Sequence, residues 1–312
     1  MNRRAEPLDG IVNLDKPAGI TSHDAVAAMR RLVPGTKVGH GGTLDPAASG
    51  VLPLCLGRAT RIAEYLFDLR KGYRTAVTLG TTTDTGDAAG TIISQKEPPL
   101  LERKNIEQLL RSLTGTQEQE VPAYAAVKHR GRPLYEYARR GEKVPKKKRT
   151  VEIYRFELIA FDPAAPAQIL CEVECSRGTY IRSLAVELGA RLGCGAHLQA
   201  LERLFVGELS LGEAFSLEQL STAAAAGTLP GMLLPLDRAL LHLEALTVTG
   251  STVEKLRAGR AVPWERSAAV EALVAAALPV RIYDPQNRFR ALARFTGSGA
   301  DILLKTDKFL SP

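Results

Sequence analysis

The spacing of apolar positions changes from strand to helix near the N-terminus. Residues 10–14 form a short apolar run typical of a strand, and residues 22–32 repeat apolar positions every three to four residues, which predicts an amphipathic helix. Thr21 or Ser22 suits the N-cap of that helix. A glycine-rich loop at 38–46 then interrupts the pattern. The sequence therefore predicts a strand and a helix that lead into an irregular loop.

Strand and helix patterns follow one another in no regular order through the middle of the chain. The predicted elements are a strand at 73–79, a helix at 105–113 closed by Gly115, strands at 151–160 and 168–175, and a helix between Gly178 and Gly193. A doubly wound parallel sheet would require strands and helices to alternate. The observed order favours an α+β fold instead.

Composition changes towards the C-terminal end of the chain. Residues 221–232 (STAAAAGTLPGM) are rich in Ala, Gly and Pro, which makes them the best linker candidate. Short strand patterns follow, two of which are joined at residues 284–287 (DPQN) as a hairpin. We therefore expect two domains, at 1–240 and 241–312, the second of them small and rich in β-structure.

Positive charge is concentrated in one segment. The chain has 312 residues and a formal net charge of +7, and residues 123–150 alone contribute +8, from ten basic residues against Glu136 and Glu142. The ten are Lys128, Arg130, Arg132, Arg139, Arg140, Lys143, Lys146, Lys147, Lys148 and Arg149. Tyrosines interleave with these cations, and aromatic rings stack on bases while cations neutralise phosphates. We expect a nucleic-acid partner; a solvated charged face is the alternative for the KKKR run alone.

Several classes of function lack their sequence signatures. The chain has no C-x-x-C pair and only scattered histidines, so we expect no metal site, and its four cysteines fit reduced core thiols. Neither a phosphate-loop motif nor a G-x-S-x-G hydrolase motif occurs. No apolar stretch approaches the roughly 18 residues of a membrane span, and no secretory signal pattern is present, so we expect a cytoplasmic protein. Carboxylate chemistry without a cofactor is what remains.

Asp45 allows two interpretations. It precedes Pro46, which disfavours helical geometry at Asp45 but suits the first position of a following helix. Taken alone, Asp45 would fit best as a helix N-cap. The sequence that surrounds it favours a catalytic role instead.

Four blocks of the sequence resemble the TruB-type tRNA pseudouridine synthases. The first, GHGGTLDPAASGVLPLCLGRATR at 39–61, is similar to the family's motif around its catalytic Asp. The others are KGYRTAVTLGTTTDTGDAAG at 71–90, VPAYAAVKHRGRPLYEYARRGEKVP at 121–145 and CSRGTYIRSLAVELGARLGCGAHLQALERL at 175–204. The resemblance spans most of residues 10–210 in the family's order. It implies a catalytic domain with a mixed, largely antiparallel sheet and flanking helices, followed by a small PUA-like β-barrel.

The resemblance also implies roles for particular residues. Asp45 would be the essential carboxylate, Tyr73 would lie against the flipped uracil and move a proton, and Arg182 would pair with Asp45. The residues implied to bind the substrate are His40, Tyr73, Tyr180 and Leu201. Each of these residues would fit an ordinary structural role if taken alone, so their joint occurrence carries the argument.

The implied reaction is the isomerisation of uridine 55 in the T loop of tRNA to pseudouridine. Isomerisation conserves atoms, so no cofactor is expected, and a base stacked in a loop must be flipped out to be reached. Residues 123–150 would grip the RNA, and we expect a monomer that acts without a guide RNA. The rivals are a non-catalytic RNA-binding protein, which the intact set of Asp45, Tyr73 and Arg182 disfavours, and a guide-RNA-dependent synthase, which the basic insertion and short C-terminal domain disfavour.

Overall fold

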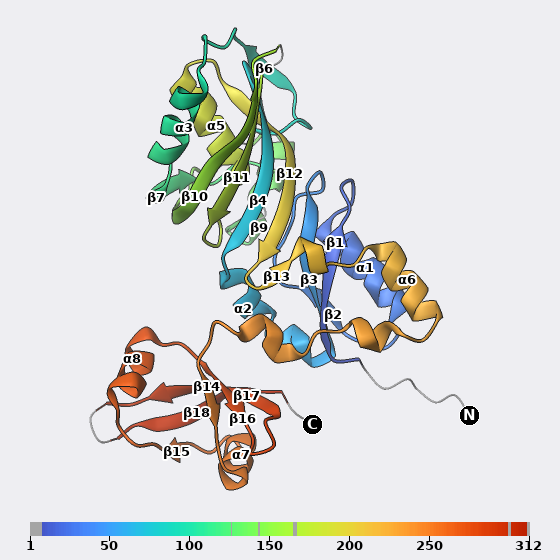
Figure 1. The fold of residues 1–312 in the computed structure, drawn as a ribbon, viewed down its shortest axis with the longest axis vertical. Helices are drawn as coiled ribbons and strands as arrows, with labels where there is room; N and C mark the ends of the chain where they lie inside the picture. The colour runs from blue at the N-terminus through green and yellow to red at the C-terminus, as the bar shows by residue number, and fades with distance from the viewer. Residues whose placement is uncertain (1–7, 126, 143, 165–166, 299–300, 311–312) are drawn as a thin grey trace.

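Two β-sheets of unequal size organise the chain (Figure 1). The computed structural model describes residues 8–310 apart from 126, 143, 165–166 and 299–300. The strands of the larger sheet are β1 (Gly10–Lys16), β2 (Val38–His40), β3 (Ser49–Leu56), β4 (Lys71–Leu79), β7 (Gly115–Glu120), β10 (Lys148–Asp162), β11 (Gln168–Cys175), β12 (Ala196–Val206) and β13 (Leu209–Ser210). Their order is β1-β3-β12-β4-β11-β10-β7, with β2 beside β3 and β13 beside β12. Among these described strands β3 and β12 alone pair in parallel, so the mixed, largely antiparallel sheet is confirmed.

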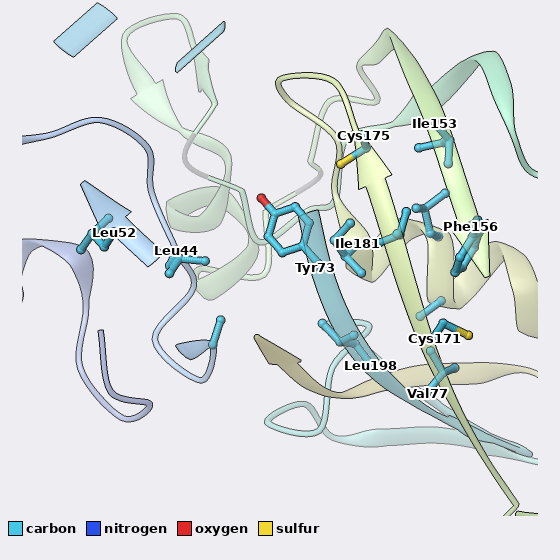
Figure 2. Close-up of a cluster of buried hydrophobic side chains, with 14 of the residues drawn as sticks. Leu44, Leu52, Tyr73, Val77, Ile153, Phe156, Cys171, Cys175, Ile181 and Leu198 are labelled. Carbon is cyan, nitrogen blue, oxygen red and sulfur yellow. The ribbon is translucent and has the colours of Figure 1, made fainter. Parts of the chain in front are cut away.

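The helices of this part of the chain are α1 (Ser22–Leu32), α2 (Ala63–Asp68), α3 (Arg103–Ser112), α4 (Leu134–Arg139), α5 (Ile181–Leu192) and α6 (Leu217–Ala225). The main core takes in α1, α3, α5 and α6, whereas α2 lies in a second cluster with Ile11, Val51 and Cys55, and α4 lies in a third. α3 contacts β10, α5 contacts β12 and α6 contacts β1. Along β11 the buried residues are Ile169, Cys171, Val173 and Cys175, which alternate with more exposed neighbours, because successive strand residues face opposite sides of a sheet. Figure 2 shows these cysteines in the apolar core beside Phe156.

The N-terminal helix begins where the sequence predicts. Thr21 is the N-cap of α1, and its hydroxyl accepts a hydrogen bond from the Asp24 backbone N–H while the Asp24 carboxylate accepts one from the Thr21 backbone N–H. Gly115, in contrast, does not close α3; the C-cap is Leu113, and Gly115 starts β7.

The linker prediction for residues 221–232 is wrong. The segment contains the end of α6 and a 3-10 helix, η3 (Leu229–Met232), and both Ala223 and Leu229 are buried in the main core. Alanine is the strongest helix former, so the alanine run extends α6 and Gly227 then ends it.

A five-stranded sheet forms the C-terminal part of the chain, in the order β14-β16-β17-β18-β15. Its elements are β14 (Ala245–Thr247), α7 (Gly250–Arg257), β15 (Val262–Pro263), α8 (Ala268–Ala276), β16 (Val280–Tyr283), β17 (Phe289–Thr296) and β18 (Leu303–Phe309). The predicted hairpin is confirmed: β16 and β17 pair antiparallel, and the Asp284 carboxylate accepts hydrogen bonds from two backbone N–H groups of the turn. This sheet has its own hydrophobic core.

The remaining regular elements are short. They are the hairpin strands β5 (Thr81–Thr83) and β6 (Ile92–Gln95), the hairpin strands β8 (Lys128–His129) and β9 (Arg132–Pro133), and the 3-10 helices η1 (Gly57–Arg61), η2 (Leu211–Glu213) and η4 (Leu236–Leu240). In the described part of the chain, no helix is long and apolar enough to cross a membrane.

Candidate active site

Asp45 lies in the loop between β2 and β3. The Ala48 backbone N–H donates to the Asp45 carbonyl in a tight turn, and no helix begins there, so the N-cap interpretation of Asp45 is wrong. Its side chain is 42% exposed. The loop therefore presents a carboxylate to solvent from a turn.

Buried polar groups hold the backbone on both sides of Asp45. The Ser22 hydroxyl accepts a hydrogen bond from the Leu44 N–H at 2.9 Å and donates one to the Leu44 carbonyl at 3.1 Å. The Lys16 ammonium donates to the Pro46 carbonyl at 3.4 Å. Because Ser22 and Lys16 are almost fully buried, these contacts exclude competing water and fix the loop.

Arg182, from the first turn of α5, pairs with Asp45. Its Nε lies 3.0 Å from Oδ2 and its Nη2 lies 3.5 Å from Oδ1; the Nε contact is ionic rather than a directed hydrogen bond because its alignment is poor. The guanidinium also donates to the carbonyls of Thr85 and Tyr124 at 3.3 and 3.1 Å. Only 5% of Arg182 is exposed, so it is not the surface helix residue that it would be taken for alone.

A cavity of about 390 Å³ opens above this pair. It is lined by Asp45, Tyr73, Tyr180, Arg182 and Leu201, among others. The structure thus brings together five of the six residues predicted for catalysis or substrate binding, from a loop, two strands and one end of α5.

Tyr73 comes from β4 and is largely buried. Figure 2 shows its hydroxyl pointing away from the core residues Val77 and Phe156. Burial raises the pKa of the Tyr73 hydroxyl above its usual value, and the positive charge of Arg203 opposes that shift. The group therefore keeps its proton near neutral pH.

His40 is not among the residues that line the cavity. It lies on β2, and its ring centroid is 6.2 Å from that of Phe67, which does line the cavity, and 6.3 Å from that of His23. Burial, followed by the charges of His23 and Arg203, lowers the pKa of His40, so its imidazole is neutral at physiological pH. Its role in substrate binding stays a prediction.

Lys71 and Arg203 also line the cavity, and neither is among the residues that the sequence predicts for the site. Lys71 precedes Tyr73 by two residues on β4, and Arg203 follows Leu201 by two residues on β12. Residues two apart on a strand share a face, so strand periodicity from the predicted pocket residues would have found them.

The basic segment is folded and partly neutralised. Arg132 forms an ion pair with Glu142 and lies over the Tyr137 ring, with 3.5 Å between the guanidinium carbon and the ring centroid. Arg139 lies over Tyr135 in the same way, at 5.5 Å. These tyrosines already stack on arginines of their own segment, which the sequence did not show. Lys143 lies outside the described residues.

Strand β7 supplies acidic partners to the end of the segment. Lys146 and Lys148 lie 3.4 and 3.1 Å from carboxylate oxygens of Glu120 and Glu118. Arg149 differs from both, because it lines the cavity and donates to the Gly178 carbonyl at 2.9 Å. The remaining cations predicted to contact RNA are Lys128, Arg130, Arg140 and Lys147; the Lys147 ammonium donates to the Lys128 carbonyl at 2.6 Å.

Two family models match the chain. The model described as "TruB family pseudouridylate synthase (N terminal domain)" matches residues 30–181, and "tRNA pseudouridylate synthase B C-terminal domain" matches residues 182–241. Residues beyond 241 lie outside both matches.

Similar curated proteins share one name, "tRNA pseudouridine synthase B". That of Syntrophobacter fumaroxidans is 43% identical over 93% of this chain and 94% of its own length. That of Methylobacillus flagellatus is 40% identical over 94% of this chain and 93% of its own length. That of Geobacillus thermodenitrificans is 46% identical over 81% of this chain and 85% of its own length.

Solved structures of multi-component complexes align with almost the whole of this chain. "Crystal Structure of a Cbf5-Nop10-Gar1 Complex" aligns with a TM-score of 0.75 at 26% identity, over 98% of this chain and 86% of the other. "Structure of H/ACA RNP bound to a substrate RNA containing 2'-deoxyuridine" aligns with a TM-score of 0.72 at 25% identity, over 97% and 85%.

Proposed function

Because this chain belongs to the TruB family of pseudouridylate synthases, and so isomerises uridine in tRNA, we propose that its target is uridine 55 of the T loop and that Asp45 is the essential carboxylate. The observation that carries this proposal is the Asp45–Arg182 pair at the wall of a cavity that also contains Tyr73. A carboxylate fixed by a guanidinium and open to a base-sized cavity can act on the sugar of a nucleoside.

Base flipping is part of this proposal. A uridine stacked in a folded loop hides its glycosidic bond, so the nucleotide must leave the stack before Asp45 can reach it. Tyr73 and Tyr180 offer aromatic rings inside the cavity, and Leu201 offers an apolar contact. In this proposal the neutral His40, behind Phe67, occupies or supports the space that the base vacates.

The groups that recognise the RNA lie around the cavity. The segment 123–150 carries the excess positive charge, so it would bind phosphates of the T arm, with affinity that falls as salt rises. The C-terminal sheet at 241–312 would be a PUA-like RNA-binding domain beside the catalytic domain at 1–240. We propose that the enzyme acts in the cytoplasm as a monomer without a guide RNA or a cofactor; bacterial relatives named for tRNA support the stand-alone part of this proposal.

One experiment tests this function. The purified protein alone is incubated with an unmodified tRNA transcript, and pseudouridine is mapped by position. We expect conversion at uridine 55 without guide RNA or added metal. Conversion only when a guide RNA and partner proteins are supplied would favour the guide-dependent rival, and conversion at another uridine would refute the assigned target.

A further inference from the structure

The cavity wall carries more positive charge than its carboxylate balances. Its cationic lining residues are Lys71, Arg149, Arg182 and Arg203, and within the described lining the only Asp or Glu is Asp45. Arg182 is paired with Asp45, and Arg149 is partly exposed. Lys71 and Arg203 are 6% and 1% exposed, so they are buried cations facing a site of chemistry.

Neither of these two cations forms an ion pair with a carboxylate of the described residues. The Arg203 guanidinium donates instead to the carbonyls of Val51, Gly42 and Thr43, at 2.7, 3.0 and 3.3 Å. The Lys71 ammonium donates to backbone carbonyls at the end of α2, that of Phe67 at 2.7 Å among them. Carbonyl dipoles solvate a cation but do not neutralise it, and burying an unpaired charge opposes folding.

Phosphate binding does not account for these two residues. Their side chains are almost fully buried, and the exposed segment at 123–150 supplies the phosphate contacts in the proposed function. A structural role explains part of the contacts that these two cations make, because Arg203 holds the loop before Asp45. It does not explain why cations, rather than neutral donors such as Ser22, face the cavity.

The reaction creates a negative charge in this cavity. When the bond between C1′ and N1 breaks, its electron pair stays on N1, and the detached uracil becomes an anion. The deficit at C1′ is met by a bond to an Asp45 oxygen or by loss of a ribose proton, which is returned later. C5 then bonds to C1′, C5 loses its proton and N1 gains one, so the isomerisation balances without any other reactant.

We propose that Lys71 and Arg203 stabilise the detached uracil anion through a positive field that the fold fixes before the reaction. This inference rests on the proposed function and adds an electrostatic role to two residues outside the expected set. A preorganised charge acts on the state in which charge develops and needs no rearrangement at that moment.

The test compares two leaving groups in single-turnover reactions at saturating enzyme. One tRNA transcript contains uridine and the other contains 5-fluorouridine, whose electron-withdrawing fluorine makes the detached ring a more stable anion. Because fluorine blocks loss of a C5 proton, consumption of the original nucleoside in a nuclease digest is measured for both.

Arg203→Met should slow uridine consumption about 100-fold, as loss of a preorganised anion-stabilising group does. With 5-fluorouridine, the slowing caused by Arg203→Met should be smaller by a factor of about ten or more. Arg203→Lys should recover most of the rate with uridine.

Ser22→Ala is the matched control, because Ser22 holds the same loop without charge. Ser22→Ala should slow the consumption of uridine and of 5-fluorouridine by the same factor. If Arg203→Met also slows the consumption of both nucleosides equally, Arg203 only holds the loop in place and the proposal is overturned. If Arg203→Met does not fold, Lys71→Met decides by the same comparison. A wild-type enzyme that leaves uridine 55 unchanged would refute the proposed function itself, whereas active wild type with equal losses refutes only this inference.

Discussion

Asp45 and Arg182 form one ion pair but differ sharply in exposure. The guanidinium is buried and held by two carbonyls and by the Asp87 carboxylate at 3.8 Å besides that of Asp45, whereas the Asp45 carboxylate is partly open to the cavity. In the proposed function the buried partner orients the carboxylate and the open partner reacts. This asymmetry is the geometric reason for assigning the chemistry to Asp45.

Asp45→Asn should abolish turnover while tRNA affinity stays nearly unchanged. The amide keeps the size of the carboxylate and one acceptor oxygen, but it cannot act as a nucleophile or base. Pseudouridine formation and filter binding measure the two quantities. Asp84→Asn is the control, because Asp84 accepts a hydrogen bond from Thr91 in the β5–β6 hairpin and does not line the cavity. Turnover within about tenfold of wild type in Asp45→Asn would contradict the assigned role. A tenfold change in rate corresponds to little more free energy than one hydrogen bond contributes.

Tyr73→Leu should reduce turnover far more than tRNA affinity. Stacking on one base contributes about 1–3 kcal/mol, a small share of binding that depends on many phosphates. Tyr73→Phe separates the two roles, because it keeps the ring and removes only the hydroxyl, which burial keeps protonated. A single-turnover rate and a dissociation constant are measured for each variant. Equal losses in rate and affinity for Tyr73→Leu, with a lowered melting temperature, would indicate structural damage instead.

At the residue scale, the sequence indicates the residues proposed to react better than it indicates the residues that support them. Asp45, Tyr73 and Arg182 lie in motifs, so a resemblance identifies them. Arg203 supports the loop through contacts about 160 positions away in sequence, and Ser22 does so across 22 positions. Such contacts depend on how β12 and α1 are placed against the loop, which no local pattern encodes.

At the element scale, the basic segment presents less net positive charge to an RNA than its composition indicates. Two of its lysines face carboxylates of β7, and exposed ion pairs such as these contribute little to stability but reduce the local field. Unlike these lysines, Arg149 faces the cavity, so it is expected to affect the bound nucleotide rather than general RNA binding.

Replacing Lys146, Lys147 and Lys148 together by Ala should weaken tRNA binding and flatten the plot of log affinity against log salt. Each lost phosphate contact lowers the slope by about 0.7–0.9, so two contacts are measurable. Turnover at saturating tRNA should persist, because none of the three lines the cavity. Arg149→Ala should show the reverse pattern, with a larger loss of turnover than of salt slope.

The acidic partners provide the matched control for this prediction. Glu118→Gln with Glu120→Gln removes two carboxylates from β7 and leaves the lysines in place, so tRNA affinity at low salt should rise. An unchanged slope in the triple lysine variant would show that the run is a solvated face. The contact would then involve Arg130, Arg132, Arg139 and Arg140.

Sequence predicted most elements because their patterns are local. β11 alternates buried and exposed residues, and α1 begins at a capping box, so both were found from spacing alone. Residues 221–232 were misread because composition does not distinguish an alanine-rich helix packed on a core from a flexible linker. That distinction depends on the burial of Leu220, Ala223 and Leu229.

At the scale of the whole molecule, the two sheets are joined by specific contacts as well as by the chain. Leu292 and Leu310 of the C-terminal part lie in one buried cluster with Ile62 and Leu66, near α2 (Figure 1). Polar contacts surround this cluster: Arg58 donates to the Leu310 carbonyl at 2.7 Å, and Lys308 pairs with Glu64 at 3.0 Å. We therefore expect the two parts to unfold together.

Tyr65→Phe should lower the free energy of unfolding by about 1–3 kcal/mol, because it leaves a partly buried carboxylate with one partner fewer. The Tyr65 hydroxyl donates to the Asp307 carboxylate, which also pairs with Arg294 at 3.0 Å, so this contact links α2 to β18. Burial and the carboxylate raise the pKa of Tyr65, which keeps the hydroxyl a donor throughout the neutral range. Urea unfolding followed by circular dichroism measures the change.

Tyr135→Phe is the control, since the Tyr135 hydroxyl has no hydrogen-bond partner among the described side chains. This variant should lower the free energy of unfolding much less. Wild type that unfolds in two separate transitions, with Tyr65→Phe affecting neither, would show that the C-terminal sheet is an independent unit and that this contact does not join it to the catalytic domain.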